Sequence, residues 1–144
     1  MKAIRVNFND IANLAGVFYV RTEAMTLGYD IPLDKEFSDD SVNSLYILVI
    51  DDNKPVSTCR INMCEGYAKI ERVATVSYKR GCGAASLAIK EAESYIKESG
   101  INLIKITSRE KALDFYLKLG YIVDETKEKY GKGEFVCLWI YKEI

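Results

Sequence analysis

The sequence predicts an α/β fold: a mixed, mostly antiparallel central sheet of about seven strands with helices on both faces. Two observations support this prediction. Three consecutive strand-like runs with short turns between them, within residues 45–76, are typical of an antiparallel meander. A helical pattern then leads into another apolar strand, as in a β-α-β crossover that places a helix on the sheet. Since 144 residues are the size of one ordinary domain, we expect a single domain over residues 1–144.

The N-terminal part of the chain supplies a strand, a helix and a loop. Residues 2–8 alternate like a short strand, and Asn9 or Asp10 can cap the helix that follows. The helix face that we expect to be buried carries four apolar residues at helical spacing: Ile11, Leu14, Ala15 and Phe18. Residues 26–44 are acidic and interrupted by glycine and proline, so they predict a loop with at most one short helix.

The rest of the chain reads as strands and two helices. The meander strands are expected at residues 45–51, 56–64 and 67–76. Apolar residues recur at helical spacing from Gly83 to Ser99, and Gly100 supplies a left-handed stop. The remaining expected elements are a strand at 102–108, a helix at 109–120 that ends at Gly120, and two strands around the turn at 131–133.

Composition and charge exclude several classes of function. A formal net charge of −1 argues against a nucleic-acid-binding surface. The chain has no histidine and its four cysteines form no C-x-x-C pair, so we expect no metal site and no histidine-activated nucleophile. No run approaches the roughly 18 apolar residues of a membrane span, and no signal peptide is visible. We therefore expect a cytoplasmic protein with reduced thiols and no membrane partner.

The stretch SYKRGCGAASLAIKEAE, residues 77–93, is the most informative part of the sequence. It places two glycines and two alanines between Gly81 and Ala85, where a helix begins. The first N–H groups of a helix have no partner within it, and removing side chains there lets a phosphate approach them, with Arg80 beside it. Neither the P-loop nor the Rossmann glycine pattern is present. A tight strand-to-helix turn with close helix packing remains the alternative.

Two motifs in this chain resemble those of the GNAT acetyltransferases. ERVATVSYKRGCGAASLAI looks like the family's strand, [RQ]-x-x-G-x-[GA] turn and helix, with Arg80, Gly83 and Ala85 at the defining positions. ALDFYLKLGY, residues 112–121, resembles its A-x-x-F-Y-x-K-x-G-[FY] helix motif. The segments at 19–37 and 54–74 are similar to the ElaA-like branch, so the resemblance covers nearly the whole chain. It implies a sheet that is splayed between the fourth and fifth strands.

The resemblance implies acetyl-CoA as co-substrate, without a metal, and direct acyl transfer to a primary amine. It places the diphosphate on the amides of the glycine-rich turn and the pantetheine arm along the preceding strand. Arg109, near that arm, stands where many members have Asn, or Gln in the ElaA-like branch. The residues that the resemblance assigns to coenzyme binding are Val73, Ala74, Thr75, Arg80, Gly81, Cys82, Gly83, Ala84, Ala85, Ser86 and Arg109.

Two residues are expected to be catalytic. Tyr116 matches the family's general acid, which protonates the departing thiolate. Glu71 is the candidate base, since it alternates with Val73 and Thr75 and should face the same cleft. A structural ion pair for this carboxylate, or a water relay from another acidic residue, stays open. Cys82 could form an acyl-cysteine at a helix N-terminus, but the family transfers directly and the thioester should lie away from the diphosphate.

The resemblance implies an acceptor that is a small amine or an amine of a peptide or protein. Arg21, Glu23, the acidic loop 34–40 and the turn at 131–133 are expected to border its site, where carboxylates would suit a cationic amine. Because members of the family are often dimers, a homodimer is one expected assembly. Two other functions stay open: a non-catalytic acyl-CoA-binding domain, and an interaction domain whose turn binds nothing.

Overall fold

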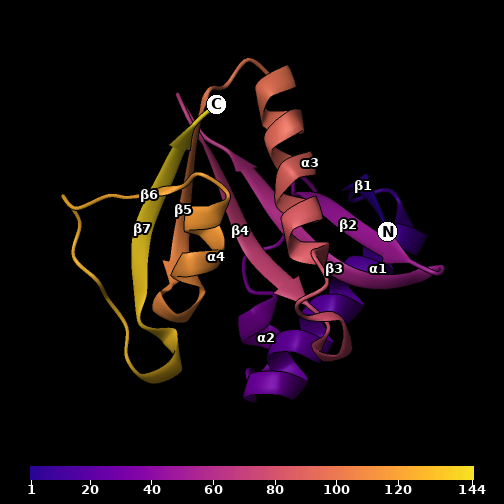
Figure 1. Ribbon diagram of the computed structural model, residues 1–144. Helices are drawn as coiled ribbons and strands as arrows, with labels where there is room; N and C mark the ends of the chain where they lie inside the picture. The colour runs from indigo at the N-terminus through magenta and orange to yellow at the C-terminus, as the bar shows by residue number, and fades with distance from the viewer.

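The computed structural model describes all residues from 1 to 144. Figure 1 shows a central sheet with α3 and α4 on one face and α1 and α2 on the other. The strands are β1 (Lys2–Asn7), β2 (Leu45–Asp51), β3 (Lys54–Met63), β4 (Ala68–Thr75), β5 (Leu103–Arg109), β6 (Ile122–Val123) and β7 (Cys137–Glu143). The helices are α1 (Ile11–Arg21), α2 (Leu33–Glu36), α3 (Ala84–Glu98) and α4 (Leu113–Lys118). These elements confirm the predicted fold class.

The sheet has seven strands in the order β1-β2-β3-β4-β5-β7-β6. Strands β1 to β4 form the predicted antiparallel meander. The side chains of β2 from Tyr46 to Val49 are all buried, because α1 packs on one face of this strand and α3 on the other. A strand that is covered on both faces is apolar at consecutive positions, which is why residues 45–51 lack polar alternation.

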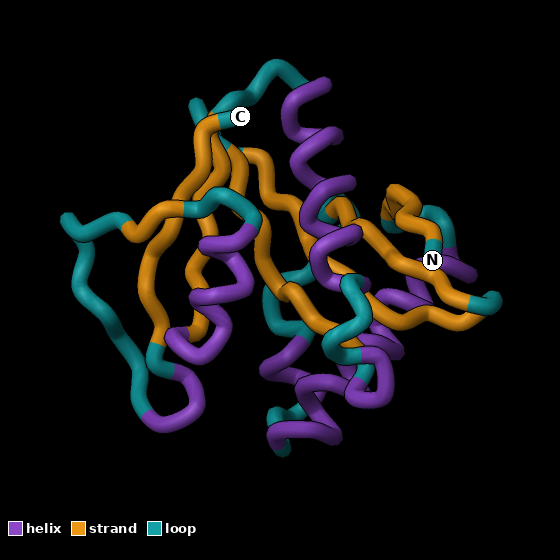
Figure 2. The backbone as a smooth tube through the Cα atoms, in the orientation of Figure 1, coloured by secondary structure: helices purple, strands orange, loops and turns teal.

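Strands β4 and β5 are parallel and meet at one end only. Two residue pairs join them, Ala68 with Ile104 and Lys69 with Lys105. Beyond Lys69 the two strands diverge, and the gap is visible between β4 and β5 in Figures 1 and 2. The splay implied by the family resemblance is therefore present. Its consequence is that the β5-facing edge of β4, over Ile70–Thr75, has no neighbouring strand to bond its backbone groups.

A β-bulge interrupts β4 beside this opening. Glu71 pairs with Arg60, and Ala74 pairs with Thr58. Two residues of β4 therefore lie between these pairs, whereas β3 has only one, so β4 contains one extra residue. Paired residues share a face of the sheet, and Arg60 and Thr58 lie on the same one. Glu71 therefore shares its face with Ala74, whereas Thr75 is on the opposite face. The predicted alternation of Glu71 with Thr75 is wrong for this reason.

Helix α1 begins where the sequence predicts, but it buries a different face. Asp10 caps it by accepting a hydrogen bond from the N–H of Asn13. The predicted face is wrong at Ile11 and Ala15, which are exposed. The buried residues of the helix are instead Leu14, Val17, Val20 and Arg21. The helix approaches the sheet so closely at Gly16 that a Cβ there would lie 3.0 Å from Leu48, and this contact sets its rotation.

The C-terminal elements are shorter than predicted. The helix expected at 109–120 is a 3-10 turn at Glu110–Ala112 followed by the six residues of α4. Of the two expected strands, β6 has only two residues, and the chain between β6 and β7 is mostly exposed. The predicted stop at Gly100 is confirmed by its left-handed φ of 85°. None of the helices combines the length and the apolar character that crossing a membrane requires.

Candidate functional site

The turn before α3 presents bare backbone to an open space. Gly81 and Gly83 have φ values of 75° and 85°, and a Cβ at either position would meet nothing within 4 Å. No side chain caps α3, and the first backbone bond of the helix runs from Leu87 N–H to the carbonyl of Gly83. The N–H groups of residues 84–86 therefore have no partner within the chain. Together with the helix dipole they form a site suited to an anion.

A cavity of about 1140 Å³ joins this turn to the splay between β4 and β5. Its walls come from the turn, the free edge of β4, the end of β5 and α4. Of the predicted coenzyme-binding residues it is lined by Val73, Ala74, Thr75, Arg80, Gly81, Gly83, Ala84, Ala85, Ser86 and Arg109. Cys82 belongs to the same turn, but its exposed side chain does not line the cavity; its Sγ lies 3.7 Å from the carbonyl of Arg80.

Tyr116 lies in the wall opposite the turn. Its ring is buried and packs edge to face against Phe115 and Tyr121, with centroids 4.9 and 5.9 Å away. Its hydroxyl forms no hydrogen bond with the protein although the residue lines the cavity. Burial raises the pKa of Tyr116 well above the ordinary value of a phenol, so the hydroxyl stays protonated. The arrangement places a protonated phenol in the wall of the cavity.

Glu71 also lines the cavity, but its carboxylate is already paired with basic side chains of the protein. Oε2 accepts hydrogen bonds from Nη2 and Nε of Arg60, at 2.7 and 3.2 Å. Oε1 lies 3.4 Å from Nζ of Lys69. An acceptor amine would compete with these two side chains for the carboxylate. The role of Glu71 as a base stays a prediction.

Arg21 is buried in the protein interior and does not line the cavity. Its side chain is 0% exposed; Nε donates to Glu36 at 2.8 Å, and Nη1 and Nη2 donate to Asp40 at 2.7 and 2.9 Å. The guanidinium also stacks over the ring of Phe37, 4.5 Å from its centroid. A cation this deep is stable only when it is fully paired. The expected contact of Arg21 with the acceptor is therefore wrong.

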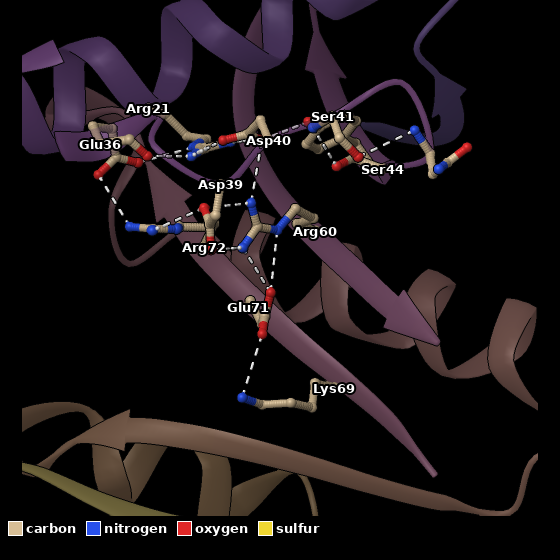
Figure 3. A network of polar contacts seen from close by, with 12 residues as sticks. Arg21, Glu36, Asp39, Asp40, Ser41, Ser44, Arg60, Lys69, Glu71 and Arg72 are labelled. Carbon is tan, nitrogen blue, oxygen red and sulfur yellow. Dashed lines mark hydrogen bonds and ion pairs between the residues drawn. The ribbon is translucent and has the colours of Figure 1, made fainter. Parts of the chain in front are cut away.

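The carboxylates of the acidic loop 34–40 are largely neutralised by arginines from the sheet (Figure 3). Arg60 holds both oxygens of Asp39, at 2.9 and 3.0 Å. Arg72 reaches Asp39 at 3.2 Å and Glu36 at 3.6 Å. The hydrogen bonds from Arg60 hold the pKa of Asp39 well below its usual range. The acidic rim expected for a cationic acceptor is thus used within the fold instead.

Glu23 lies outside the cavity and supports the turn that leads to it. Its carboxylate accepts hydrogen bonds from the backbone N–H of Ser77, at 3.1 and 3.3 Å, and from the Ser77 hydroxyl at 2.6 Å. These bonds satisfy the first N–H of the 3-10 turn at Ser77–Lys79. Glu23 does not line the cavity. The expectation that it contacts the acceptor is not supported.

Arg109 lines the cavity but directs its donors to two segments outside the sheet. Nε and Nη2 donate to the backbone and carboxylate of Glu134, at 2.9 and 3.0 Å, and Nη1 donates to the hydroxyl of Tyr29 at 3.1 Å. The guanidinium lies between the rings of Tyr29 and Phe135, 4.9 and 5.0 Å from their centroids. It therefore links the helical segment that continues α1, at Tyr29, to the 3-10 turn at Gly133–Phe135 that precedes β7. Its contact with the pantetheine arm stays a prediction.

Sequence reasoning missed Arg60 and Arg72, which organise this part of the molecule. Arg60 lies between Cys59 and Ile61 in β3, and Arg72 lies between Glu71 and Val73 in β4. A buried arginine in a central strand must be paired with carboxylates, so Arg60 was a recognisable signal for a buried ion pair. The identity of its partners depended on the tertiary structure, since Asp39 lies 21 residues away in the sequence.

Comparisons with known proteins agree with the geometry. A family model described as "Acetyltransferase (GNAT) family" matches residues 9–121. The uncharacterized N-acetyltransferase YjcF of Bacillus subtilis is 31% identical over 83% of this chain and 86% of its own length. The crystal structure of a putative N-acetyltransferase from Lactobacillus plantarum has a TM-score of 0.87 at 23% identity, covering 99% of this chain and 97% of that one. Escherichia coli ElaA has a TM-score of 0.81 at 17% identity, covering 99% and 100%.

Proposed function

The chain belongs to the acetyltransferase (GNAT) family, and on this premise we propose that it transfers an acetyl group from acetyl-CoA to a primary amine. One observation carries the proposal. The uncapped N-terminus of α3, with its unpartnered N–H groups, opens into the same cavity as the free edge of β4 and the hydroxyl-bearing Tyr116. Acyl transfer from a coenzyme needs these three parts: an anion site, a backbone edge and a proton donor.

The turn at 80–86 fits a diphosphate. A Cβ at Gly81 or Gly83 would project into open space, so the backbone has room for a ligand that lies directly on it. Arg80 is exposed and forms no ion pair within the protein, which leaves its guanidinium available for phosphate oxygens. Each hydrogen bond to a charged group stabilises a complex by about 1.5–3 kcal/mol. A few such bonds would anchor the coenzyme at this end.

The free edge of β4 fits the amide-containing arm of the coenzyme. Val73, Ala74 and Thr75 line the cavity, and no strand pairs with this edge. An extended arm can bond such an edge as an added strand would. A backbone N–H beside the bulge would also stabilise the negative charge that develops on the thioester oxygen.

The side chains supply the proton transfers. Acetyl-CoA brings the activated acyl group as a thioester, which a neutral amine attacks directly. Glu71 is proposed to accept the amine proton, either directly or through a water molecule. Tyr116 donates its proton to the departing sulfur, and its raised pKa means that the proton is present when it is needed.

The charges around the cavity restrict the class of acceptor only partly. The two acidic residues that line the cavity, Glu36 and Glu71, are both paired with arginines, so the cavity offers no unpaired carboxylate to a cation. A small amine, a peptide and a protein amine all remain acceptors to test. The cytoplasmic location and the homodimer stay predictions.

The experiment has two arms. Calorimetry with acetyl-CoA measures binding, and release of free thiol measures transfer in the presence of amino acids, polyamines and peptides. Binding together with amine-dependent thiol release supports the proposal. Binding without thiol release from any amine would indicate a non-catalytic acyl-CoA-binding domain. If acetyl-CoA does not bind at high micromolar concentration, both coenzyme-dependent functions are excluded and an interaction domain is the remaining alternative.

Replacing Arg80 by alanine is expected to weaken acetyl-CoA binding. Loss of one or two charge-assisted hydrogen bonds corresponds to roughly a 10- to 100-fold rise in Kd. The fold should be unaffected, since Arg80 is exposed and has no ion-pair partner. Lys90→Ala is the control, because Lys90 is an exposed cation on the following helix, α3, and does not line the cavity. Equal Kd values for Arg80→Ala and Lys90→Ala would contradict the phosphate assignment.

A further inference from the structure

The bulge in β4 contains a residue in an unfavourable conformation. Arg72 follows Glu71 in the extra-residue segment and has a φ of 52°, in the left-handed region. A side chain at positive φ costs about 1–3 kcal/mol and persists only where the surroundings hold it. Arg72 and the next three residues of β4 line the cavity. The contacts that hold Arg72 in this conformation therefore also determine the conformation of the backbone that lines the cavity.

The side chain of Arg72 is attached to the segment that contains α2. Its Nη2 donates to Oδ1 of Asp39 at 3.2 Å, and its Nη1 lies 3.6 Å from Oε1 of Glu36. The Glu36 side chain is only 2% exposed and is itself fixed by Arg21, whose Nε donates to Oε2 at 2.8 Å. Arg72 is thus held by two carboxylates: the buried Glu36, at ion-pair distance, and the more exposed Asp39, to which it donates a hydrogen bond.

The residue before Arg72 is held by the same cluster. Arg60 donates to Glu71 at 2.7 Å and to both oxygens of Asp39. Asp39 is therefore bound by two arginines, one from β3 and one from the bulge itself (Figure 3). Two consecutive residues of the bulge, Glu71 and Arg72, are joined to one group of ion pairs.

The far side of the bulge is held differently. The hydroxyl of Ser57 donates to the carbonyl of Ala74 at 2.9 Å and lies 2.9 Å from the hydroxyl of Thr75. Arg72 and Val73 have no pairing partner in β3, and Val73 lies between the two anchored sides. The side chains around the bulge therefore fix the orientation of its unpaired backbone.

We propose that Arg72 is a positioning residue, whose ion pairs with Asp39 and Glu36 hold the bulge so that the backbone of residues 73–75 faces the cavity. The inference rests on the proposed function, because this backbone is the part assigned to the acyl group and its arm. The proposal also assigns a structural role to the acidic loop 34–40. Its carboxylates act on the shape of β4 rather than on the acceptor.

Three substitutions at position 72 distinguish the effect of the side-chain ion pairs from the effect of the backbone conformation. Arg72→Ala removes the ion pairs with Asp39 and Glu36 but keeps the unfavourable free energy of a side chain at positive φ. Arg72→Gly removes the same ion pairs and also relieves that strain, because glycine adopts positive φ readily. A displacement of the reacting groups by about 1 Å lowers turnover by up to about 100-fold, so both variants should lose 10- to 100-fold in kcat. The KM for acetyl-CoA should rise by a smaller factor than kcat falls, because the arm loses aligned backbone contacts while the diphosphate site at 80–86 is intact. Arg72→Lys keeps the charge and should recover part of the loss.

The control is Arg5→Ala, which removes an ion-paired arginine that lies outside the cavity, on β1. It should leave kcat and KM unchanged. Wild-type turnover in Arg72→Gly would overturn the proposal, because the backbone conformation would then suffice without the anchor. A raised KM for acetyl-CoA with unchanged kcat would overturn it as well.

Hydrogen exchange tests the anchor independently of activity. In ligand-free Arg72→Ala, the amides of residues 71–76 should exchange at least tenfold faster than in the wild type, while those of β2 are unchanged. Unchanged exchange at 71–76 would overturn the proposal. A uniform increase over the whole sheet would do so too, because the network would then only stabilise the fold. If no amine supports turnover in the wild type, the proposed function fails, and the exchange experiment still decides the role of Arg72.

Discussion

Tyr116→Phe is expected to lower kcat by about 10²- to 10⁴-fold, the range that general acid catalysis usually contributes. The substitution removes one hydroxyl that has no hydrogen-bond partner in the protein, so the buried ring and its packing stay in place. Binding of acetyl-CoA should be unchanged, since the anion site lies at the start of α3. The loss should therefore appear in kcat rather than in KM.

The measurement is thiol release at saturating acetyl-CoA, with calorimetry to confirm binding. Tyr121→Phe is the matched control: its ring packs against Tyr116, but its hydroxyl donates to Glu93 at 2.9 Å and it does not line the cavity. Since burial raises the pKa of Tyr116, the protonated form persists below that pKa and is lost only as the pH rises through it. Equal kcat values for Tyr116→Phe and the wild type would remove Tyr116 from the mechanism.

Arg21→Ala is expected to lower the free energy of unfolding by about 3–5 kcal/mol. The side chain is fully buried and pairs with Glu36 and Asp40. Its removal leaves Glu36 without its nearest cation in the interior, and Asp40 with only Arg60, at 3.4 Å. For a chain of this length the melting temperature should fall by roughly 10–15 °C.

Urea unfolding followed by circular dichroism gives the free energy directly. Arg21→Lys keeps the charge, but a single ammonium cannot reproduce the paired donors of the guanidinium, so its loss should be intermediate. Arg5→Ala is the control, since Arg5 pairs with Glu91 and Glu98 at the surface and its removal should change stability little. A free energy of unfolding for Arg21→Ala within about 0.5 kcal/mol of the wild type would contradict the structural role.

The anion site could be predicted because its signals are local. The glycines at 81 and 83, the small residues after them and the start of an amphipathic helix all lie within a few residues of one another. Helix N-terminal N–H groups lack partners wherever a helix begins, so their position follows from the helix alone. Tyr116 was located only through the family motif, since a tyrosine on a short helix does not by itself indicate catalysis.

The acceptor side could not be predicted, because its contacts join distant segments. The sequence suggested that Arg21 and the acidic loop face a ligand, yet Arg21 pairs with Glu36 and Asp40, 15 and 19 residues away. The bulge at Arg72 had no recognisable local signal either. A single extra residue changed which side chains share a face, and so altered the argument for Glu71.

The amino-acid order alone determined the fold class, the meander, the glycine turn and the start of α3. Periodicity, turn residues and the unsatisfied groups of a helix end act over a few residues. The tertiary structure decided which charges are buried together, where β4 leaves β5, and how the bulge turns its backbone to the cavity. These features depend on the pairing of segments far apart in the chain, and the cost of burying an unpaired charge selects the partners only once those segments meet.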